Sequence, residues 1–302
     1  LIYFSLDFIK NTEPQYIISR NLYAATFLGL LFRRNVIYET HSPEYGFRKK
    51  LQKWLLTSNK IKMVVISEAL KKIIQNFHHI SSENIYVFHD AARSGQLRLD
   101  LLQRTELKRQ LLSNKFDLDD YEKVIGYFGH LYSGRGIEII EELAKQNSWC
   151  AFIVYGGNEA DIREYKIRNT NKNLFFMGYI HPKKARKAMA MMDVLLMPYQ
   201  KSVSIGIKGI DTSKWMSPMK LFEYLSVGVP IISSNISVLK EVLIDSENCL
   251  LVEPDDVNAW SDALQRIISN VELEEKLGFN AHSLYKDKYT WKHRAKDMLD
   301  LL

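Results

Sequence analysis

Short apolar runs and longer amphipathic stretches alternate along the chain, and this alternation predicts its secondary structure. Runs rich in Ile, Val, Tyr and Phe indicate buried strands at 16–19, 36–41, 62–67, 84–88, 123–129, 150–155, 173–177 and 193–197. Stretches with apolar residues three and four positions apart indicate helices at 22–32, 49–56, 101–113 and 258–268. Strands that alternate with helices in this way are typical of an α/β protein with doubly wound parallel sheets.

Polar residues stand directly at or after the ends of several predicted strands. His41 ends the run at 36–41, Ser67 is placed to cap the helix after the third strand, and Asp90 follows the fourth strand. In open parallel sheets, ligands bind beyond the carboxyl ends of the strands. We therefore expect these three side chains to face a ligand-binding cleft.

The stretch at 217–234 combines a complete local structure with reactive groups. Ser217 is expected to cap a helix, and Pro218 to occupy its first position, where the missing N–H costs nothing. Gly228 is expected to end the helix as a left-handed cap, and an apolar strand follows. The helix N-terminus at Met219 offers free N–H groups and the positive end of the helix dipole, which favour a phosphate.

Two charged side chains of this predicted helix suit the same kind of ligand. Lys220 adds a full positive charge beside the helix N-terminus. Glu223, one turn further along, can accept hydrogen bonds from two neighbouring hydroxyls, such as those of a ribose. An ordinary capped helix with a solvated Lys and Glu is the alternative, and spacing alone does not separate the two.

A glycine-bearing loop at 130–136 is a second candidate for binding a phosphate. It lies between the strand at 123–129 and a helix that begins at Ile137, and Arg135 can bind a phosphate through two parallel hydrogen bonds. Gly156 follows the next strand, where a backbone without a Cβ can approach a ligand closely. The alternative here is a surface loop with a solvated arginine.

Together these motifs resemble the retaining glycosyltransferases of the GT-B fold, family-4 type, also called glycosyl transferases group 1. The resemblance covers nearly the whole chain and rests mainly on four runs, at 38–41, 130–136, 211–216 and 217–234. It implies an α/β fold with two Rossmann-like, doubly wound domains that face each other across a cleft. It also implies transfer of a sugar from a nucleotide diphosphate sugar, with retention of configuration, in polysaccharide or glycoconjugate biosynthesis.

The resemblance implies roles for individual residues. His41 is expected near the sugar and diphosphate, Asp211 is expected to reach the donor sugar, and Lys220 is expected to neutralise the leaving diphosphate. The implied donor-binding residues are His130, Arg135, Gly156, Tyr179, Ile180, Met219, Leu221 and Glu223. The expected donor is a UDP- or GDP-sugar, the expected acceptor is a saccharide or a lipid-linked molecule, and no metal is expected to be obligatory.

Three positions depart from the pattern of this family. Arg135 stands where lysine is usual and is a sound replacement. His130 stands where arginine is usual, and Trp215 stands eight residues before Glu223, where a second glutamate is usual. The latter two departures leave open a catalytically silent GT-B-like protein that serves as a binding or scaffold subunit. A GT-B nucleotide-sugar epimerase, which needs no separate acceptor, is the enzymatic alternative.

The predicted domains are a partial N-terminal acceptor-side domain at 1–118 and a nucleotide-sugar-binding domain at 119–288. A C-terminal helix at 289–302 is expected to cross back to the first domain. Judged against ordinary domain sizes, about 70 residues are expected ahead of Leu1, so the N-terminal domain is expected to be truncated.

Charge is unevenly distributed within a net charge of +6. Residues 1–118 hold 18 Lys and Arg against 10 Asp and Glu, and the remainder holds 23 against 25. A basic half indicates an anionic partner, and without a nucleic-acid motif a membrane surface or phosphorylated acceptor is favoured over nucleic acid. The basic helix at 49–56, with Phe47 and Trp54 among its apolar members, fits either an anionic membrane surface or an ordinary surface helix.

Cysteine usage and apolar run length bear on localisation. Cys150 and Cys249 have no partner at metal-ligand spacing and read as buried thiols in a reducing compartment. No apolar run is long enough to span a bilayer, and no signal peptide is visible. We expect a cytoplasmic protein, with the inner face of the membrane as a candidate location.

Overall fold

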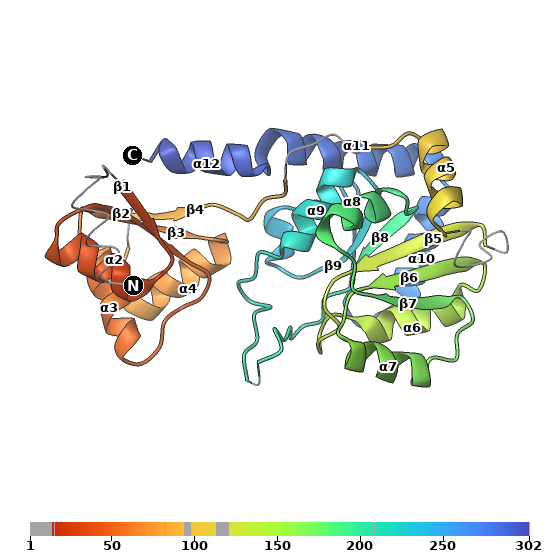
Figure 1. Cartoon of the computed structure of the whole chain (residues 1–302), viewed down its shortest axis with the longest axis horizontal. Coiled ribbons are helices and arrows are strands. Elements are labelled where there is room, and N and C mark those ends of the chain that lie inside the picture. Colours follow the sequence, from red (N-terminus) through yellow and green to blue (C-terminus); the bar gives the residue numbers. More distant parts are fainter. Residues whose placement is uncertain are drawn as a thin grey trace. The chain divides into compact units, whose positions relative to one another are not determined.

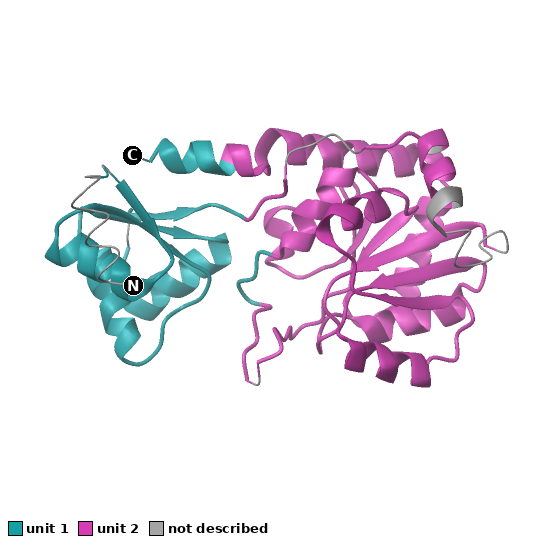
Figure 2. Cartoon of the chain, viewed as in Figure 1, with its two compact units in different colours: residues 1–89, 214–217, 294–302 teal, residues 90–213, 218–293 magenta. Residues whose placement is uncertain are grey.

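The computed structural model describes residues 14, 16–81, 83–93, 98–112, 121–207 and 209–301 (Figure 1). Its backbone contacts divide the chain into two compact units, drawn in teal and magenta in Figure 2. Unit 1 comprises residues 1–89, 214–217 and 294–302, and unit 2 comprises residues 90–213 and 218–293. The boundary that the sequence predicts between 118 and 119 lies outside the described residues and stays a prediction.

Unit 1 contains a parallel sheet of four strands in the order β1-β2-β3-β4. Its elements are β1 (Tyr16–Ser19), α2 (Leu22–Thr26), the π-helical turn η1 (Phe27–Leu31), β2 (Asn35–Thr40), α3 (Phe47–Leu56), β3 (Ile61–Val65), α4 (Glu68–His78) and β4 (Ile85–Val87). Apolar side chains of β2 and β3, such as Tyr38 and Met63, pack with Leu55 of α3 and Ile74 of α4 in one buried core. This agrees with the predicted strand and helix alternation.

Two local predictions in unit 1 can be compared with the structure. Ser67 caps α4 as predicted, because its hydroxyl accepts a hydrogen bond from Leu70 N at 3.0 Å. The single helix predicted at 22–32 is instead a short α-helix followed by the π-helical turn η1. Gly29 of this turn packs directly against the Ile61 side chain, where a Cβ would overlap it.

Unit 2 contains a parallel sheet of six strands in the order β10-β9-β8-β5-β6-β7. Its elements are α5 (Leu101–Leu112), β5 (Lys123–Phe128), α6 (Ile137–Gln146), β6 (Cys150–Tyr155), α7 (Glu159–Arg168), β7 (Leu174–Gly178), α8 (Pro182–Ala190), β8 (Val194–Met197), α9 (Met219–Val227), β9 (Ile231–Ser234), η2 (Leu239–Glu241), β10 (Leu250–Val252), α10 (Val257–Ile268) and α11 (Val271–Lys288). The strand order reverses between β5 and β8, which makes this the topological switch point of the sheet.

Helices cover both faces of the unit 2 sheet (Figure 1). On one face α6 and α10 pack together, with Trp260 of α10 fully buried among strand side chains such as Phe152. On the other face α9 packs against α8 and α11. Burial on both faces explains why these strands read as continuous apolar runs. The two sheets and their helices confirm the α/β fold class with two Rossmann-like units.

The start of α9 differs by one residue from the prediction. The helix begins at Met219, and Pro218 occupies the N-cap position with extended backbone instead of the first helical position predicted for it. Ser217 therefore lies one residue too early to be the N-cap. The predicted end is confirmed, because Gly228 closes the helix in a left-handed conformation with φ of 64°.

The C-terminal helix α12 (Trp291–Leu299) contributes its residues from Arg294 onward to unit 1. There Met298 packs against Ile37 and Val64 of the unit 1 sheet. Both cysteines are free and buried, as predicted. Of the residues that the structure describes, none forms a helix long and apolar enough to cross a membrane.

Candidate functional site

A pocket of about 500 Å³ opens at the carboxyl ends of the central strands of unit 2. It is lined by Phe128, Gly129, His130, Arg135, Tyr155, Gly156, Gly157, Tyr179, Ile180, Pro182, Ala185, Met189, Tyr199, Pro218, Met219, Lys220 and Glu223. These residues end or follow β5, β6, β7 and β8, lie on α8, or lie at or beside the start of α9, so the pocket includes the topological switch point. Its volume suits a small organic ligand.

Eight of the residues that the resemblance implicates line this one pocket. They are His130, Arg135, Gly156, Tyr179, Ile180, Met219, Lys220 and Glu223. They come from four separate segments of the chain, and the fold of unit 2 brings them together. Their individual roles stay predictions.

Lys220 occupies the inner part of the pocket and is buried in a polar but incompletely bonded environment. Its Nζ lies 4.0 Å from the centre of the Tyr127 ring and 4.6 Å from that of Tyr199, in cation–π contact with both. Among the described residues, this buried ammonium has no hydrogen-bond partner. Burial, with the nearby Arg135 charge, holds the pKa of Lys220 well below its usual value, while Glu223 opposes the shift.

Arg135 supplies a second cation to the same pocket. Its Nη1 donates a hydrogen bond of 3.0 Å to the Tyr199 hydroxyl, and the guanidinium lies 5.1 Å from the centre of the same ring. The Nε of Arg135 is buried and finds no acceptor within the described part of the chain. The single Tyr199 side chain thus contacts both cations, and each cation keeps a buried donor without an acceptor among the described residues.

Glu223 lies one helical turn after Lys220 and also lines the pocket. Burial raises the pKa of its carboxyl group, while the charges of Lys220 and Arg186 partly counter that effect. A partly buried carboxyl group in this position can accept hydrogen bonds from hydroxyl groups of a ligand.

His130 does not add a full charge to the pocket. Its ring stacks on Tyr132 with the ring centres 4.8 Å apart and the planes 4° from parallel. Burial lowers the pKa of His130, and the charges of Arg135 and Lys220 lower it further. The imidazole is therefore neutral near pH 7 and can donate one hydrogen bond to a ligand.

Two glycines shape the floor of the pocket. Gly156 has φ of 125°, and a Cβ at this position would overlap the carbonyl oxygen of Gly129. Gly129 N in turn donates to Tyr155 O at 3.0 Å. The ends of β5 and β6 therefore meet backbone to backbone, which leaves room for a ligand above them.

The other end of the pocket is largely apolar. Tyr179 has 76% of its surface exposed, and Ile180 before α8 and Pro182, Ala185 and Met189 of α8 continue the lining. Flat apolar surfaces of this kind can pack against a planar ring. The pocket thus combines a cationic end with an apolar end.

Two predicted residues of unit 2 lie outside the pocket lining. Leu221 is buried in the core of its unit, and its N–H donates to Pro218 O at 2.9 Å. Asp211 organises the loop before α9, because its Oδ1 accepts hydrogen bonds from Val203 N and Ser213 N, each at 2.9 Å. Although partial burial raises it, these N–H donors lower the pKa of Asp211 to about 2.

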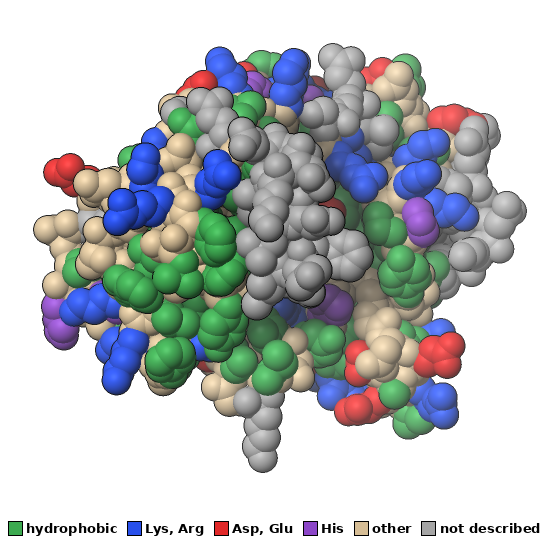
Figure 3. All heavy atoms as spheres, turned by 60° about the vertical axis from the view of Figure 1, so that its left-hand side comes forward, with side chains coloured by type: hydrophobic (Ala, Val, Ile, Leu, Met, Phe, Trp, Pro, Cys, Tyr) green, Lys and Arg blue, Asp and Glu red, His purple; other side chains and the backbone are tan. Residues whose placement is uncertain are grey.

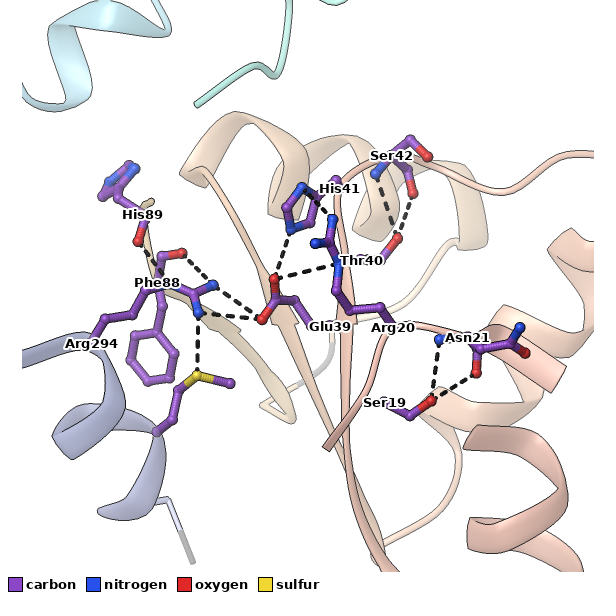
Figure 4. A network of polar contacts seen from close by, with 11 residues as sticks. Ser19, Arg20, Asn21, Glu39, Thr40, His41, Ser42, Phe88, His89 and Arg294 are labelled. Carbon is purple, nitrogen blue, oxygen red and sulfur yellow. Dashed lines mark hydrogen bonds and ion pairs between the residues drawn. The ribbon is translucent and has the colours of Figure 1, made fainter. Parts of the chain in front are cut away.

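His41 belongs to unit 1, where it follows β2 and takes part in a polar network (Figure 4). Its Nε2 lies 2.7 Å from Glu39 Oε1, and its Nδ1 lies 3.0 Å from Arg20 Nη2. Ser67 is almost fully buried, and its hydroxyl donates to Trp215 O at 2.8 Å. Trp215 itself packs against the apolar core of unit 1.

Several lining residues are not predicted from the sequence. The most important of them is Tyr199, which contacts both cations of the pocket. Tyr199 follows β8 directly after Pro198, and its side chain is fully buried. Its position after a predicted strand was the available signal, but nothing in the sequence pairs it with Arg135 or Lys220. In the described part of the chain, no group of three or more His, Cys, Asp or Glu side chains is arranged to hold a metal ion.

The chain is similar in sequence to known glycosyltransferases. Residues 122–270 match the family described as glycosyl transferases group 1. An uncharacterised glycosyltransferase of Methanocaldococcus jannaschii is 20% identical over 257 residues, which cover 82% of this chain and 61% of that protein. The capsular polysaccharide biosynthesis glycosyltransferase CapM of Staphylococcus aureus is 22% identical over 237 residues, which cover 76% of this chain and 57% of CapM. The chain thus spans less than two thirds of the length of these relatives.

Solved structures show the same fold. HepE of Anabaena, in complex with UDP, matches with a TM-score of 0.77 at 14% identity, over 98% of this chain and 80% of HepE. At this identity the likeness establishes the fold. Residues 122–270 are therefore similar to a glycosyl transferases group 1 domain, and the likeness to HepE extends the two-unit α/β fold over nearly the whole chain.

Proposed function

We propose that the protein is a glycosyltransferase that moves a sugar from a nucleotide diphosphate sugar to a saccharide or lipid-linked acceptor. The observation that carries this proposal is the pair of buried cations in the unit 2 pocket, Lys220 and Arg135, each with a donor that the protein leaves unbonded. A diphosphate offers several anionic oxygens, and it would satisfy both donors at once.

The leaving diphosphate would be stabilised by three groups that converge on the inner end of the pocket. Lys220 and Arg135 supply charge, and the N-terminus of α9 supplies backbone N–H groups at Met219. Charge that develops on the leaving group is best stabilised by donors already in position before the reaction. By analogy with the family, we propose that the sugar is transferred with retention of configuration.

The rest of the donor would extend from this diphosphate site. Glu223 would accept hydrogen bonds from the ribose hydroxyls, and the base would lie against the apolar end at Tyr179 and Ile180. HepE has been solved with UDP-glucose, which makes a UDP-sugar the first donor to test, ahead of a GDP-sugar.

The acceptor and pathway are proposed at the level of chemical class. CapM is named for capsular polysaccharide biosynthesis, and this supports a role in polysaccharide or glycoconjugate biosynthesis. His41 is proposed to approach the donor sugar from unit 1, and Asp211 is proposed to act by holding the loop before α9 in place.

We also propose that unit 1 contacts an anionic membrane surface through α3. Phe47 and Trp54 of this helix are 67% and 50% exposed, and both Lys50 and Lys53 are exposed beside them. Residues 20–62 hold nine Lys and Arg against two Glu. Figure 3, which brings the side of unit 1 forward, shows hydrophobic side chains gathered among Lys and Arg side chains. An apolar face flanked by cations suits the interface of an anionic bilayer.

A catalytically silent binding or scaffold protein is the second candidate. It is favoured by the lowered pKa of His130, which removes a charge from the phosphate site, and by Trp215, which packs in unit 1 where the family usually carries a glutamate. Such a protein would bind the nucleotide but would turn nothing over.

The test is a transfer assay with UDP- and GDP-sugars and a panel of saccharide and lipid-linked acceptors, followed by release of the nucleoside diphosphate. We expect release that depends on acceptor, with a product of unchanged anomeric configuration. Arg135→Met should lower turnover at least about tenfold, because a charge-assisted hydrogen bond contributes about 1.5–3 kcal/mol. The exposed Arg163→Met on α7 is the matched control. Binding without release would favour the scaffold, and conversion of the donor sugar without acceptor would favour an epimerase.

A further inference from the structure

The network around His41 in unit 1 connects three separate segments of the chain (Figure 4). Glu39 and His41 lie at the end of β2, Arg20 lies between β1 and α2, and Arg294 comes from α12. Glu39 is at the centre, because its carboxylate oxygens contact the other three side chains. The side chain of Glu39 is only 10% exposed, whereas that of Arg20 is 65% exposed.

The contacts of His41 determine which ring nitrogen carries the proton. Arg20 Nη2, at 3.0 Å from Nδ1, belongs to a guanidinium group that can only donate hydrogen bonds. Nδ1 must therefore accept, and the proton of a neutral imidazole must be on Nε2. Nε2–H then donates to the Glu39 carboxylate at 2.7 Å, so both contacts require the same tautomer.

Glu39 is held rigidly from the opposite side by Arg294. The guanidinium of Arg294 contacts Glu39 Oε2 at 3.2 Å through Nη2, and its Nε donates to the His89 carbonyl at 3.0 Å. Burial alone raises the pKa of Glu39, but its bond to His41 and the charge of Arg294 bring it to about 2. Glu39 is therefore a carboxylate, able to accept but not donate, throughout the neutral range.

Arg20 is attached to a fixed corner of the backbone but has a free outer face. Asn21 caps α2, since its Oδ1 accepts from Ala24 N at 3.0 Å, and Ser19 exchanges hydrogen bonds with Asn21. The corner keeps the Arg20 backbone in place, while the exposed side chain can adjust. A hydroxyl group can donate to one neighbour and accept from another, so it can insert between Arg20 and Nδ1 of His41 without leaving either unsatisfied.

We propose that Glu39, anchored by Arg294, is a positioning residue that fixes His41 in the Nε2–H tautomer and so presents Nδ1, with Arg20 beside it, as a receptor for a sugar hydroxyl. The hydroxyl donates its proton to Nδ1 and accepts from the Arg20 guanidinium. All the residues that determine the tautomer lie in unit 1. The use of this receptor in sugar transfer rests on the proposed function.

The tautomer is tested by long-range proton–nitrogen NMR of the whole ¹⁵N-labelled chain near neutral pH, with His41→Gln to assign the signals. We expect Nε2 of His41 to carry the proton and Nδ1 to be the unprotonated type. In an Arg20→Met background, where the guanidinium no longer favours the same form, Glu39→Leu should yield a mixture of tautomers, whereas Glu39→Gln, which keeps an acceptor oxygen, should retain the Nε2–H form. His181, whose Nδ1 accepts from Lys183 N at 3.2 Å, is an internal control that should not change.

Two results would overturn the assignment. One is a wild-type His41 with the proton on Nδ1, which needs no variant and is therefore independent of whether Glu39→Leu folds. The other is an unchanged tautomer in the folded Glu39→Leu/Arg20→Met double variant, which would show that Glu39 does not set it.

The receptor itself is tested with the exposed Arg20→Met. We expect an unchanged His41 tautomer, an unchanged affinity for UDP in the unit 2 pocket, and a KM for the sugar-bearing substrates about 10- to 100-fold higher, as for loss of a charge-assisted hydrogen bond. An unchanged KM in an active enzyme would contradict the receptor. If the wild-type protein transfers no sugar at all, the proposed function fails while the NMR result still decides the tautomer.

Discussion

At the scale of single residues, the unit 2 pocket is dominated by charges that the protein itself does not satisfy. Lys220 is buried between two tyrosine rings without a hydrogen-bond partner among the described residues, and Arg135 leaves a buried Nε unbonded. Leaving a buried charged group unsatisfied costs stability in the free protein. A bound anion removes that cost, so the same residues that weaken the fold strengthen binding.

Lys220→Met tests this cost directly in the ligand-free protein. Methionine fills a similar volume without a charge, so we expect the free energy of unfolding to rise by about 1–3 kcal/mol. Urea unfolding measures the change. Lys187→Met, at an exposed position of α8, should stay within about 0.5 kcal/mol of the wild type. A large loss of stability in Lys220→Met would contradict this expectation, because it would show that the buried ammonium stabilises the ligand-free protein.

The pH dependence of stability gives a second test at Lys220. Its folded pKa lies well below the value of 10.5 expected in the unfolded chain, so between these values the unfolded chain binds more protons. The free energy of unfolding of the wild type should therefore rise with pH relative to Lys220→Met, by at most about 1.4 kcal/mol per unit. Unfolding of both proteins at pH 7 to 9.5 measures it, and parallel curves would contradict the shift.

The sequence predicts the charged residues of the pocket better than the residues that position them. Local sequence patterns predict Lys220, Arg135 and Glu223 as pocket residues, because a helix N-terminus and a glycine-bearing loop are typical of anion-binding sites. Tyr199 is missed, since its importance comes only from contacts with residues 64 and 21 positions away in the chain. Leu221 lies in the same motif, but its side chain points into the core of its unit.

At the scale of elements, the pocket depends on how closely β5 and β6 end against each other. Gly156 and Gly129 meet through backbone atoms, and Gly156 N donates to Gly178 O at 2.8 Å at the end of β7. Three strand ends are thereby joined below the ligand site. A side chain at this point would separate them.

Gly156→Ala tests this close approach, with Gly209→Ala as its control. Both glycines have positive φ, but a Cβ at Gly209 would meet nothing within 4 Å. The control should cost about 1–2 kcal/mol for the left-handed backbone alone. Gly156→Ala should cost about 1–3 kcal/mol more, because its φ of 125° suits a side chain less well than the 82° of Gly209 and because a Cβ would overlap Gly129. If urea unfolding shows the same loss of stability in both variants, the close approach of Gly156 to Gly129 contributes nothing to it.

Element types are predicted well, and element boundaries less well. The strands of both sheets follow from their apolar runs, since burial on both faces leaves a strong signal. The start of α9 is displaced by one residue because Pro218 suits both an extended N-cap and a first helical position. The π-helical turn at Phe27–Leu31 has no distinct sequence pattern, as it carries the same apolar spacing as an α-helix.

From the exposed apolar and basic side chains of α3 we predict that the protein binds anionic membranes. Wild-type protein should sediment with vesicles that contain anionic lipid, more weakly at high salt, and should not sediment with purely zwitterionic vesicles. The double variant Phe47→Ser and Trp54→Ser should lose this binding. Ile167→Ser, at an exposed position of α7 in unit 2, removes a comparable apolar side chain and should not. Equal sedimentation of both variants would contradict contact through α3.

At the scale of the whole molecule, the chain has two α/β units, each built on a parallel sheet, and we propose a different role for each. Unit 2 contains the pocket that we propose binds a nucleotide diphosphate, and unit 1 contains the His41 network. The alternation of strands and helices predicts both sheets. It does not predict that Arg294, near the end of the chain, bonds to Glu39 in unit 1, because 255 positions separate the two residues.

The unit 2 pocket is proposed to bind a nucleoside diphosphate through Lys220 and Arg135. The most direct measurement is thermal unfolding of the wild type, Lys220→Met and Lys187→Met with UDP, GDP and ADP. A ligand at about 100 times its dissociation constant stabilises the folded state by about 2.7 kcal/mol. We predict that one of the three nucleotides, with UDP tested first, raises the unfolding temperature of the wild type and of Lys187→Met but not of Lys220→Met. No response to any nucleotide, or an equal response in Lys220→Met, would contradict the account.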